Sequence, residues 1–173
     1  MSDNVLPVAA GAQHRKRCSP HPGGEPSGLD LVTMSEDPQA DSLTSRLNQS
    51  ERARLVADID AALPRVHRYA PATPILSIPS LDALIKGHVL LKAECAQATG
   101  SFKIRGALNV MTKLSSEGAD RVVAFSSGNH GIGVAYAARC LGMSATIVVP
   151  HDAPGAKVDR IRRLGGEIVW YDR

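Results

Sequence analysis

The sequence predicts an α/β fold with a parallel sheet, because strand and helix patterns alternate along its second half. Short apolar runs typical of buried strands occur at residues 121–125, 145–149 and 167–171. Each of the first two runs is followed by a segment whose apolar residues recur at helical spacing. This alternation implies right-handed crossovers and a small parallel sheet flanked by helices.

Residues 1–50 have a different composition, with scattered prolines among Gly, Ser, Asp and Gln and little apolar periodicity. We expect them to form a disordered N-terminal extension, and Met34 is an alternative start to Met1. A short amphipathic helix follows, with Ser50 as its N-cap and Pro64 at its end. Its apolar residues are Leu55, Ile59, Ala62 and Leu63.

Residues 89–94 are predicted to form a buried strand, and a helix follows with Ser101 as its N-cap. Its apolar face comprises Ile104, Ala107, Leu108, Met111 and Leu114.

Two further helices connect the three predicted strands. The first carries Val134, Ala135, Ala138 and Leu141 and ends at Gly142 in a left-handed cap. The second begins near Pro154, ends at Gly165–Gly166, and has its apolar face at Val158, Ile161 and Leu164.

Lys103 stands at a helix entrance, where unpaired backbone N–H groups and the positive end of the helix dipole favour an anionic partner over an ammonium group. That position suits an amine nucleophile, although a lysine in a first helical turn is more often a solvated surface charge.

The segment 126–133 follows the strand 121–125 and precedes a helix, so it lies at the carboxyl end of a strand. Ligands bind at that edge of parallel sheets, where glycines let backbone amides approach an anion. Its glycines are spaced G-x-x-G-x-G, so the dinucleotide fingerprint G-x-G-x-x-G is excluded.

Two motifs resemble those of the fold-type II pyridoxal-phosphate enzymes, in the form found in threonine and serine dehydratases (the threonine ammonia-lyase family). The first has its Schiff-base lysine at Lys103 and comprises Lys92, Glu94, Gln97, Thr99, Gly100, Ser101, Phe102, Lys103, Arg105, Gly106 and Ala107. The second is the asparagine loop Ser126-Ser127-Gly128-Asn129-His130-Gly131. Both occur in the family's order, and Thr73-Pro74-Ile75 extends the resemblance to roughly residues 53–172. The resemblance implies a three-layer fold like that of the tryptophan synthase β subunit, present here incompletely.

The resemblance also implies roles for individual residues. Lys103 would bind pyridoxal 5'-phosphate, Phe102 would pack beside its ring, and Asn129 would hydrogen-bond the ring hydroxyl. The substrate carboxylate would bind at Ser126, Ser127, Gly128, Asn129 and His130. Ser127 matches the second-face base of serine racemases and is the second catalytic candidate. Ile132 departs from the glutamine often found at its position, which makes the edge of the loop more apolar.

The implied activity is conversion of L-threonine or L-serine into an α-keto acid and ammonia. A serine racemase-like enzyme would share every residue seen here, and a non-catalytic truncated relic is a third interpretation. We expect residues 51–115 to belong to the larger lobe, residues 116–173 to form the small α/β lobe, and the remainder of the large lobe to be absent. A separate C-terminal lobe or a second copy of the chain would then be a partner.

Composition predicts a soluble cytoplasmic protein, with 43% hydrophobic residues, a formal net charge of +3 and no apolar run long enough to span a bilayer. We therefore expect no membrane or nucleic-acid partner. The basic cluster Lys157, Arg160, Arg162 and Arg163 is interpreted as a solvated helix face. Three widely separated cysteines and unclustered histidines predict neither disulfides nor a metal site.

Overall fold

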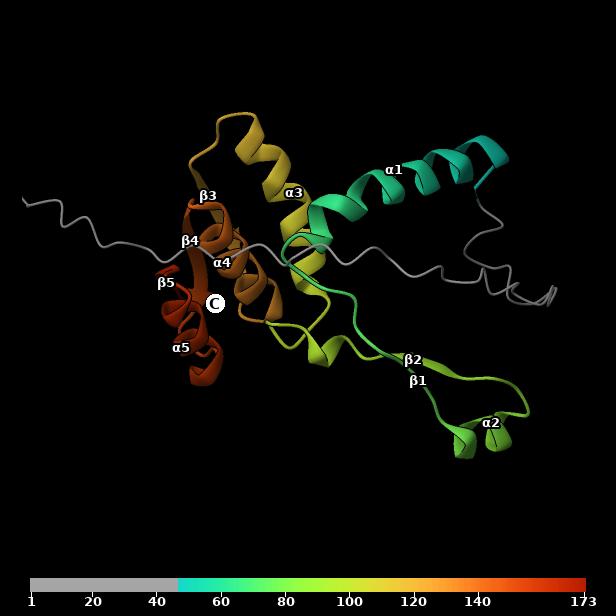
Figure 1. Ribbon diagram of the computed structural model, residues 1–173. Coiled ribbons are helices and arrows are strands. Elements are labelled where there is room, and N and C mark those ends of the chain that lie inside the picture. Colours follow the sequence, from blue (N-terminus) through green and yellow to red (C-terminus); the bar gives the residue numbers. More distant parts are fainter. Residues whose placement is uncertain (1–46) are drawn as a thin grey trace, which may run out of the picture.

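The computed structural model of the chain describes residues 47–173, which form five α-helices, five strands and one short 3-10 helix (Figure 1). In chain order they are α1 (Gln49–His67), β1 (Ile75–Ser77), α2 (Pro79–Ile85), β2 (Leu90–Lys92), η2 (Glu94–Ala96), α3 (Lys103–Ser116), β3 (Arg121–Phe125), α4 (Asn129–Leu141), β4 (Ser144–Pro150), α5 (Gly155–Arg163) and β5 (Glu167–Tyr171).

The second half of the chain forms the predicted parallel sheet, with strand order β3-β4-β5. The predicted bounds of β3 and β5 are confirmed, and β4 is one residue longer at each end than residues 145–149. The parallel α/β fold class is therefore confirmed.

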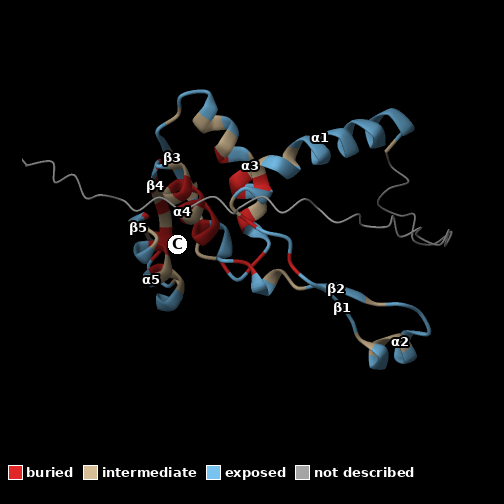
Figure 2. Cartoon of the chain, in the orientation of Figure 1, coloured by how far each residue is buried: buried red, intermediate tan, exposed pale blue. Residues whose placement is uncertain are grey.

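One face of the sheet carries the hydrophobic core, which includes the fully buried Ile147 and Val149 of β4. α4 and α5 pack on this face, and α3 packs on α4 (Figure 2). Residues on the opposite face are open: Val123 is 71% exposed and Phe125 is 66% exposed. Within residues 47–173, helices thus cover one face of the sheet, as an incomplete three-layer fold requires.

Small residues let α4 lie close to its neighbours. A Cβ at Gly131 would sit 3.0 Å from Cγ2 of Ile147 and 3.3 Å from Cδ1 of Ile161. Gly142 ends the helix in the predicted left-handed conformation, with φ of 72°. Gly131 therefore serves the packing of α4 onto the sheet and α5.

The first half of the chain extends away from this core (Figure 1). β1 and β2 form a two-stranded antiparallel ribbon with α2 between them, and all residues of both strands are exposed. The prediction of a buried strand at residues 89–94 was wrong in two respects. The strand covers only Leu90–Lys92, and all three of its residues are exposed.

Helix starts also differ from the predictions. Asn48, not Ser50, caps α1, and it shares a capping box with Glu51. Pro64 lies inside α1, which continues to His67. Phe102 occupies the N-cap position of α3, and Ser101 makes no capping hydrogen bond, because its hydroxyl is turned inward.

The expectation for residues 1–50 falls almost wholly outside the described range, which begins at residue 47. The division into residues 51–115 and 116–173 stays a prediction. In the described range no helix is both long and apolar enough to cross a membrane.

Candidate functional site

Lys103 lies in the first turn of α3, as predicted; it is the first residue of the helix and is exposed. The next residue, Ile104, is fully buried and fixes this turn against the core. The Lys103 amine lies 4.9 Å from the centroid of the Phe102 ring, which is itself 58% exposed. The amine is therefore accessible to a ligand beside an open aromatic ring.

An ion-pair network holds the segment before α3. Arg105 donates two hydrogen bonds to Glu94, at 2.9 Å to Oε2 and 2.8 Å to Oε1. The Thr73 hydroxyl donates to Oε1 of Glu94 at 2.6 Å, and Lys92 donates to the Thr73 carbonyl. The Arg105 hydrogen bonds are the main cause that lowers the pKa of Glu94 to about 2, although burial opposes the shift. Thr73 and the charges of Arg105 and Lys92 contribute to the same lowering.

The loop between η2 and α3 is fixed at several points. The Gln97 amide donates to the Pro71 carbonyl at 2.7 Å, and Gly100 turns the chain with φ of 68°. Two buried oxygen atoms of this loop, Oε1 of Gln97 and Oγ of Ser101, have no hydrogen-bond partner among the described residues. Ser101 is 8% exposed and stands two residues before Lys103.

The second predicted loop joins β3 to α4. Ser126 extends the strand pairing by donating its N–H to the Val148 carbonyl at 3.0 Å. Its hydroxyl oxygen accepts hydrogen bonds from the backbone N–H groups of Gly128 at 3.2 Å and Gly131 at 3.0 Å. The N–H groups of Asn129 and His130, in the first turn of α4, have no partner in residues 47–173. Two backbone donors therefore remain for an anion.

Packing of α4 on α3 brings the two loops to the same end of the fold (Figure 1). A Cβ at Gly133 of α4 would lie 3.2 Å from the carbonyl oxygen of Lys103. The start of α3 thus lies beside the second turn of α4, at the carboxyl end of β3. The structure therefore brings the start of α3, with Phe102 and Lys103, to the end of α4 where the loop Ser126–His130 lies, and the roles assigned to these residues stay predictions.

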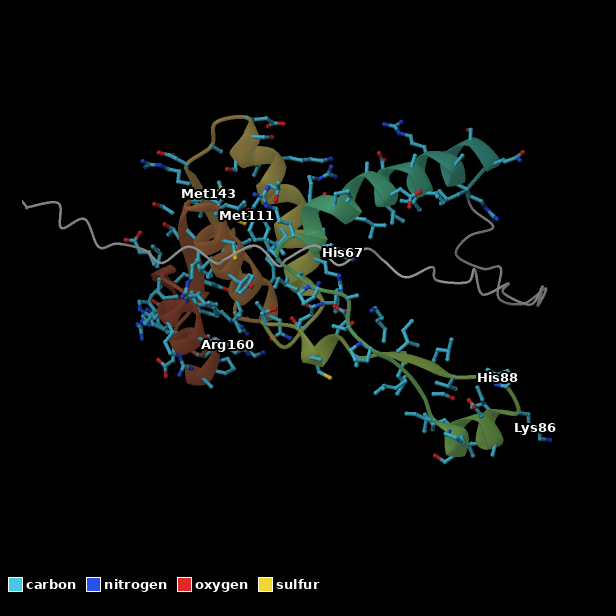
Figure 3. The ribbon with its side chains drawn as sticks, in the orientation of Figure 1. His67, Lys86, His88, Met111, Met143 and Arg160 are labelled. Carbon is cyan, nitrogen blue, oxygen red and sulfur yellow. The ribbon has the colours of Figure 1, made fainter. Side chains whose placement is uncertain are left out.

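Two basic residues of α5 belong to this region, contrary to the interpretation of their cluster as a solvated face. The Arg160 guanidinium donates to the Ala98 carbonyl at 2.8 Å and lies 3.4 Å from the Cβ position of Gly100 (Figure 3). Nζ of Lys157 lies 3.8 Å from the Cβ position of Gly128. Their i, i+3 spacing beside the apolar face of α5 is the sequence signal that could have found them.

The other two residues of the cluster point elsewhere. Arg162 pairs with Asp159 at 3.8 Å and covers the Trp170 ring, and Arg163 is exposed. For these two the interpretation as a solvated face agrees with the structure.

A separate apolar cavity of about 200 Å³ lies along the free edge of β3. His130 borders it, whereas Asn129 and Ser127 do not. Its other lining residues come from α3, β3 and α4: Gly106, Ala107, Val110, Met111, Leu114, Val122, Val123, Ala124 and Val134. The described residues contain no cluster of three metal-ligating side chains, and both described cysteines, Cys95 and Cys140, are free.

Comparison with known families gives one match, to the family described as pyridoxal-phosphate dependent enzyme, over residues 67–173. The chain belongs to this family. The match includes both loops and the whole parallel sheet. The fold-type II assignment and pyridoxal phosphate as the family's cofactor are thereby confirmed.

Curated relatives and solved structures of this family include racemases and ammonia-lyases. A serine racemase of Oryza sativa subsp. indica is 44% identical over 118 residues, which are 68% of this chain and 35% of the racemase. An L-threo-3-hydroxyaspartate ammonia-lyase of a Pseudomonas species is 47% identical over 117 residues, 67% of this chain and 37% of the lyase. The structure of processed threonine deaminase isoform 2 from Solanum lycopersicum has a TM-score of 0.65 and 36% identity, and the match covers 73% of this chain and 35% of the deaminase.

The chain spans about a third of the length of these relatives. The relatives place this chain in the group of pyridoxal-phosphate enzymes that includes racemases and dehydratases. They do not distinguish among the individual reactions of that group.

The residues present fit the reactive end of pyridoxal phosphate. An exposed lysine amine can bond its aldehyde, and the Phe102 ring offers an open apolar surface beside that amine. The unpartnered hydroxyl of Ser101 is a further hydrogen-bonding group close by in the chain.

Proposed function

We propose that this chain carries the lysine and the substrate-carboxylate loop of an enzyme that converts L-threonine or L-serine into an α-keto acid and ammonia. The single observation that supports this most is the contact of Gly133 with the Lys103 carbonyl, because it sets the backbone of Lys103 against the second turn of α4, close to the loop that begins this helix. Proximity of a nucleophilic amine to an anion-binding loop is what an enzyme acting on amino acids requires.

Each site residue has a defined task in this proposal. Pyridoxal phosphate, when bound, supplies the electron sink that stabilises negative charge at the substrate Cα. Lys103 would hold the cofactor through its amine, and the same amine, when free, would take the α-proton of the substrate as a general base. Phe102 packs beside the cofactor ring, and Asn129 hydrogen-bonds the ring hydroxyl.

Carboxylate binding falls to the loop Ser126–His130. The free N–H groups of Asn129 and His130 point from the positive end of α4, where a carboxylate is stabilised. A fixed carboxylate orients the Cα–H bond toward Lys103, so that proton removal and loss of the β-hydroxyl occur in one geometry.

A serine racemase-like reaction is the second candidate, favoured by one residue. Ser127 is half-buried in the carboxylate loop, and its position matches the second-face base of serine racemases. It would return a proton to the opposite face of Cα. Product analysis separates the two reactions, because dehydration yields a keto acid and racemisation yields the D-amino acid.

The chain matches about a third of its relatives' length, so the rest of the site would come from a partner. We propose that a polypeptide equivalent to that portion, or a second copy of this chain, completes the site. A relic without chemistry is the competing interpretation, and it predicts that neither addition produces keto acid from threonine.

Borohydride reduction of the chain with pyridoxal phosphate, followed by peptide mapping, tests the proposal. Reduction makes permanent any bond between a lysine amine and the cofactor aldehyde. We expect labelling at Lys103, its loss in Lys103→Ala, and normal labelling in Lys113→Ala, which removes an exposed lysine from the last turn of the same helix. Labelling spread over surface lysines, and unchanged by Lys103→Ala, would contradict the proposal.

A further inference from the structure

Lys157 places a cation directly beside the carboxylate loop. Apart from Gly128 and its two chain neighbours, its Nζ is the one described atom within 4 Å of the Cβ position of Gly128, at 3.8 Å. The side chain is half-buried, and in residues 47–173 its ammonium group has no hydrogen bond or ion pair. The ammonium group is therefore available to pair with an anion.

The surroundings of Gly128 carry no competing carboxylate among the described residues. Asp159, the acidic residue of α5, pairs with Arg162. The half-buried carboxylate of the lysine segment, Glu94, is bound to Arg105. The charge of Lys157 is therefore left for a ligand.

The loop beside Lys157 also offers backbone donors. The Ser126 hydroxyl takes the N–H groups of Gly128 and Gly131, which leaves those of Asn129 and His130. Gly128 has no side chain, so no Cβ separates its backbone from the Lys157 ammonium group, which lies 3.8 Å from the Cβ position. An anionic group placed there would meet two N–H donors and one ammonium group.

We propose that Lys157 is a further substrate-binding residue, whose ammonium group pairs with the carboxylate of the amino acid held at the loop Ser126–His130. This inference rests on the proposed function. Lys157 adds to the loop a charge that discriminates a carboxylate from a neutral group of the same shape. Backbone N–H groups alone donate to either kind of group. Amino acids would thus be favoured over the corresponding amides.

The test uses the full chain without cofactor and follows backbone amide resonances by NMR. The probe is L-lactate, which has a carboxylate and a hydroxyl but no group that reacts with an amine. L-lactamide is the neutral control, and sodium chloride at equal concentration controls for ionic strength. We expect lactate, and not lactamide, to shift the amides of Asn129 and His130 in a saturable manner.

Three variants assign the effect to Lys157. Lys157→Gln should raise the Kd for lactate about tenfold, as loss of a charge-assisted contact predicts. Lys157→Arg should bind as the parent chain does. Arg163→Gln, which removes the same charge from an exposed position of α5, should leave the Kd unchanged.

The inference is overturned if lactate produces no saturable shift at these amides, if lactamide shifts them equally, or if Lys157→Gln and Arg163→Gln behave alike. Borohydride labelling of Lys103 in Lys157→Gln should equal that of the parent chain. Failure of labelling in the parent chain would count against the proposed function alone, because lactate binding needs no cofactor.

Discussion

The backbone of Gly133 lies against the carbonyl of Lys103. A Cβ at Gly133 would stand 3.2 Å from that oxygen and 3.3 Å from the nitrogen of Ile104. Contacts this short are tighter than side chains normally make, and backbone atoms cannot rotate out of the way. The fifth residue of α4 therefore sets where the first turn of α3, with its lysine, can lie.

Gly133→Ala should move α3 and destabilise the chain. Overpacking of this kind costs about 1–3 kcal/mol, measurable as a loss in the free energy of unfolding in urea. Labelling of Lys103 by pyridoxal phosphate should fall as well. Gly106→Ala is the matched control, because a Cβ at Gly106 in α3 meets nothing within 4 Å. There the better helix propensity of alanine should add about 0.5–1 kcal/mol, and equal losses in both variants would refute the packing argument.

The glycines of the second loop have different tertiary neighbours, which the sequence alone does not reveal. Their spacing predicted that the backbone approaches an anion closely. In the structure, however, Gly131 faces Ile147 and Gly133 faces the start of α3. Gly128 alone borders the space left for a ligand. The same residue type serves packing or binding, and only the tertiary neighbours distinguish the two.

Glu94 makes stability depend on pH in a defined direction. Its pKa is lowered from 4.5 to about 2, so the stabilisation is fully present above 4.5 and is lost as pH falls through 4.5 toward 2. Between pH 6 and pH 3 the parent chain should lose about 2 kcal/mol more than Glu94→Gln. Urea unfolding at both values measures this, with Glu117→Gln, an exposed position, as control. Equal losses in the parent and Glu94→Gln would refute the role of the ion pair.

Arg160 connects α5 to the segment that precedes Lys103. Its hydrogen bond to the Ala98 carbonyl spans 62 residues of sequence. Arg160→Ala should therefore speed hydrogen exchange in residues 97–102 and lower the free energy of unfolding by about 1 kcal/mol. Arg163→Ala, on the exposed side of the same helix, should change neither quantity. Unchanged exchange in Arg160→Ala would show that the loop is held by its other contacts.

Local patterns predicted most of the sheet and the position of Lys103, because alternating apolar runs and helix periodicity are encoded within a few residues. β3, β5 and the cap at Gly142 are confirmed for that reason. Predictions that depended on tertiary context failed. Leu90 and Leu91 look like core residues but lie exposed on a two-stranded ribbon, and Ser101 turns its hydroxyl inward although serine is a preferred N-cap. Lys157 and Arg160 were interpreted as part of a solvated face, because their spacing beside the apolar face of α5 does not show which loops the helix faces.

Ser126 offers the sharpest test of the carboxylate loop itself. Its hydroxyl oxygen accepts the N–H groups of Gly128 and Gly131, and so fixes the loop before α4 without occupying the donors of Asn129 and His130. Ser126→Ala leaves two N–H groups unpaired and should cost about 1–2 kcal/mol in the free energy of unfolding. Because the loop then loses its fixed shape, the Kd for lactate should rise while labelling of Lys103 persists.

Ser127→Ala is the control. Its hydroxyl makes no hydrogen bond within residues 47–173, so this variant should leave stability unchanged. If Ser126→Ala binds lactate like the parent chain, the hydroxyl does not shape the anion site, and the donors of α4 are held by the helix alone.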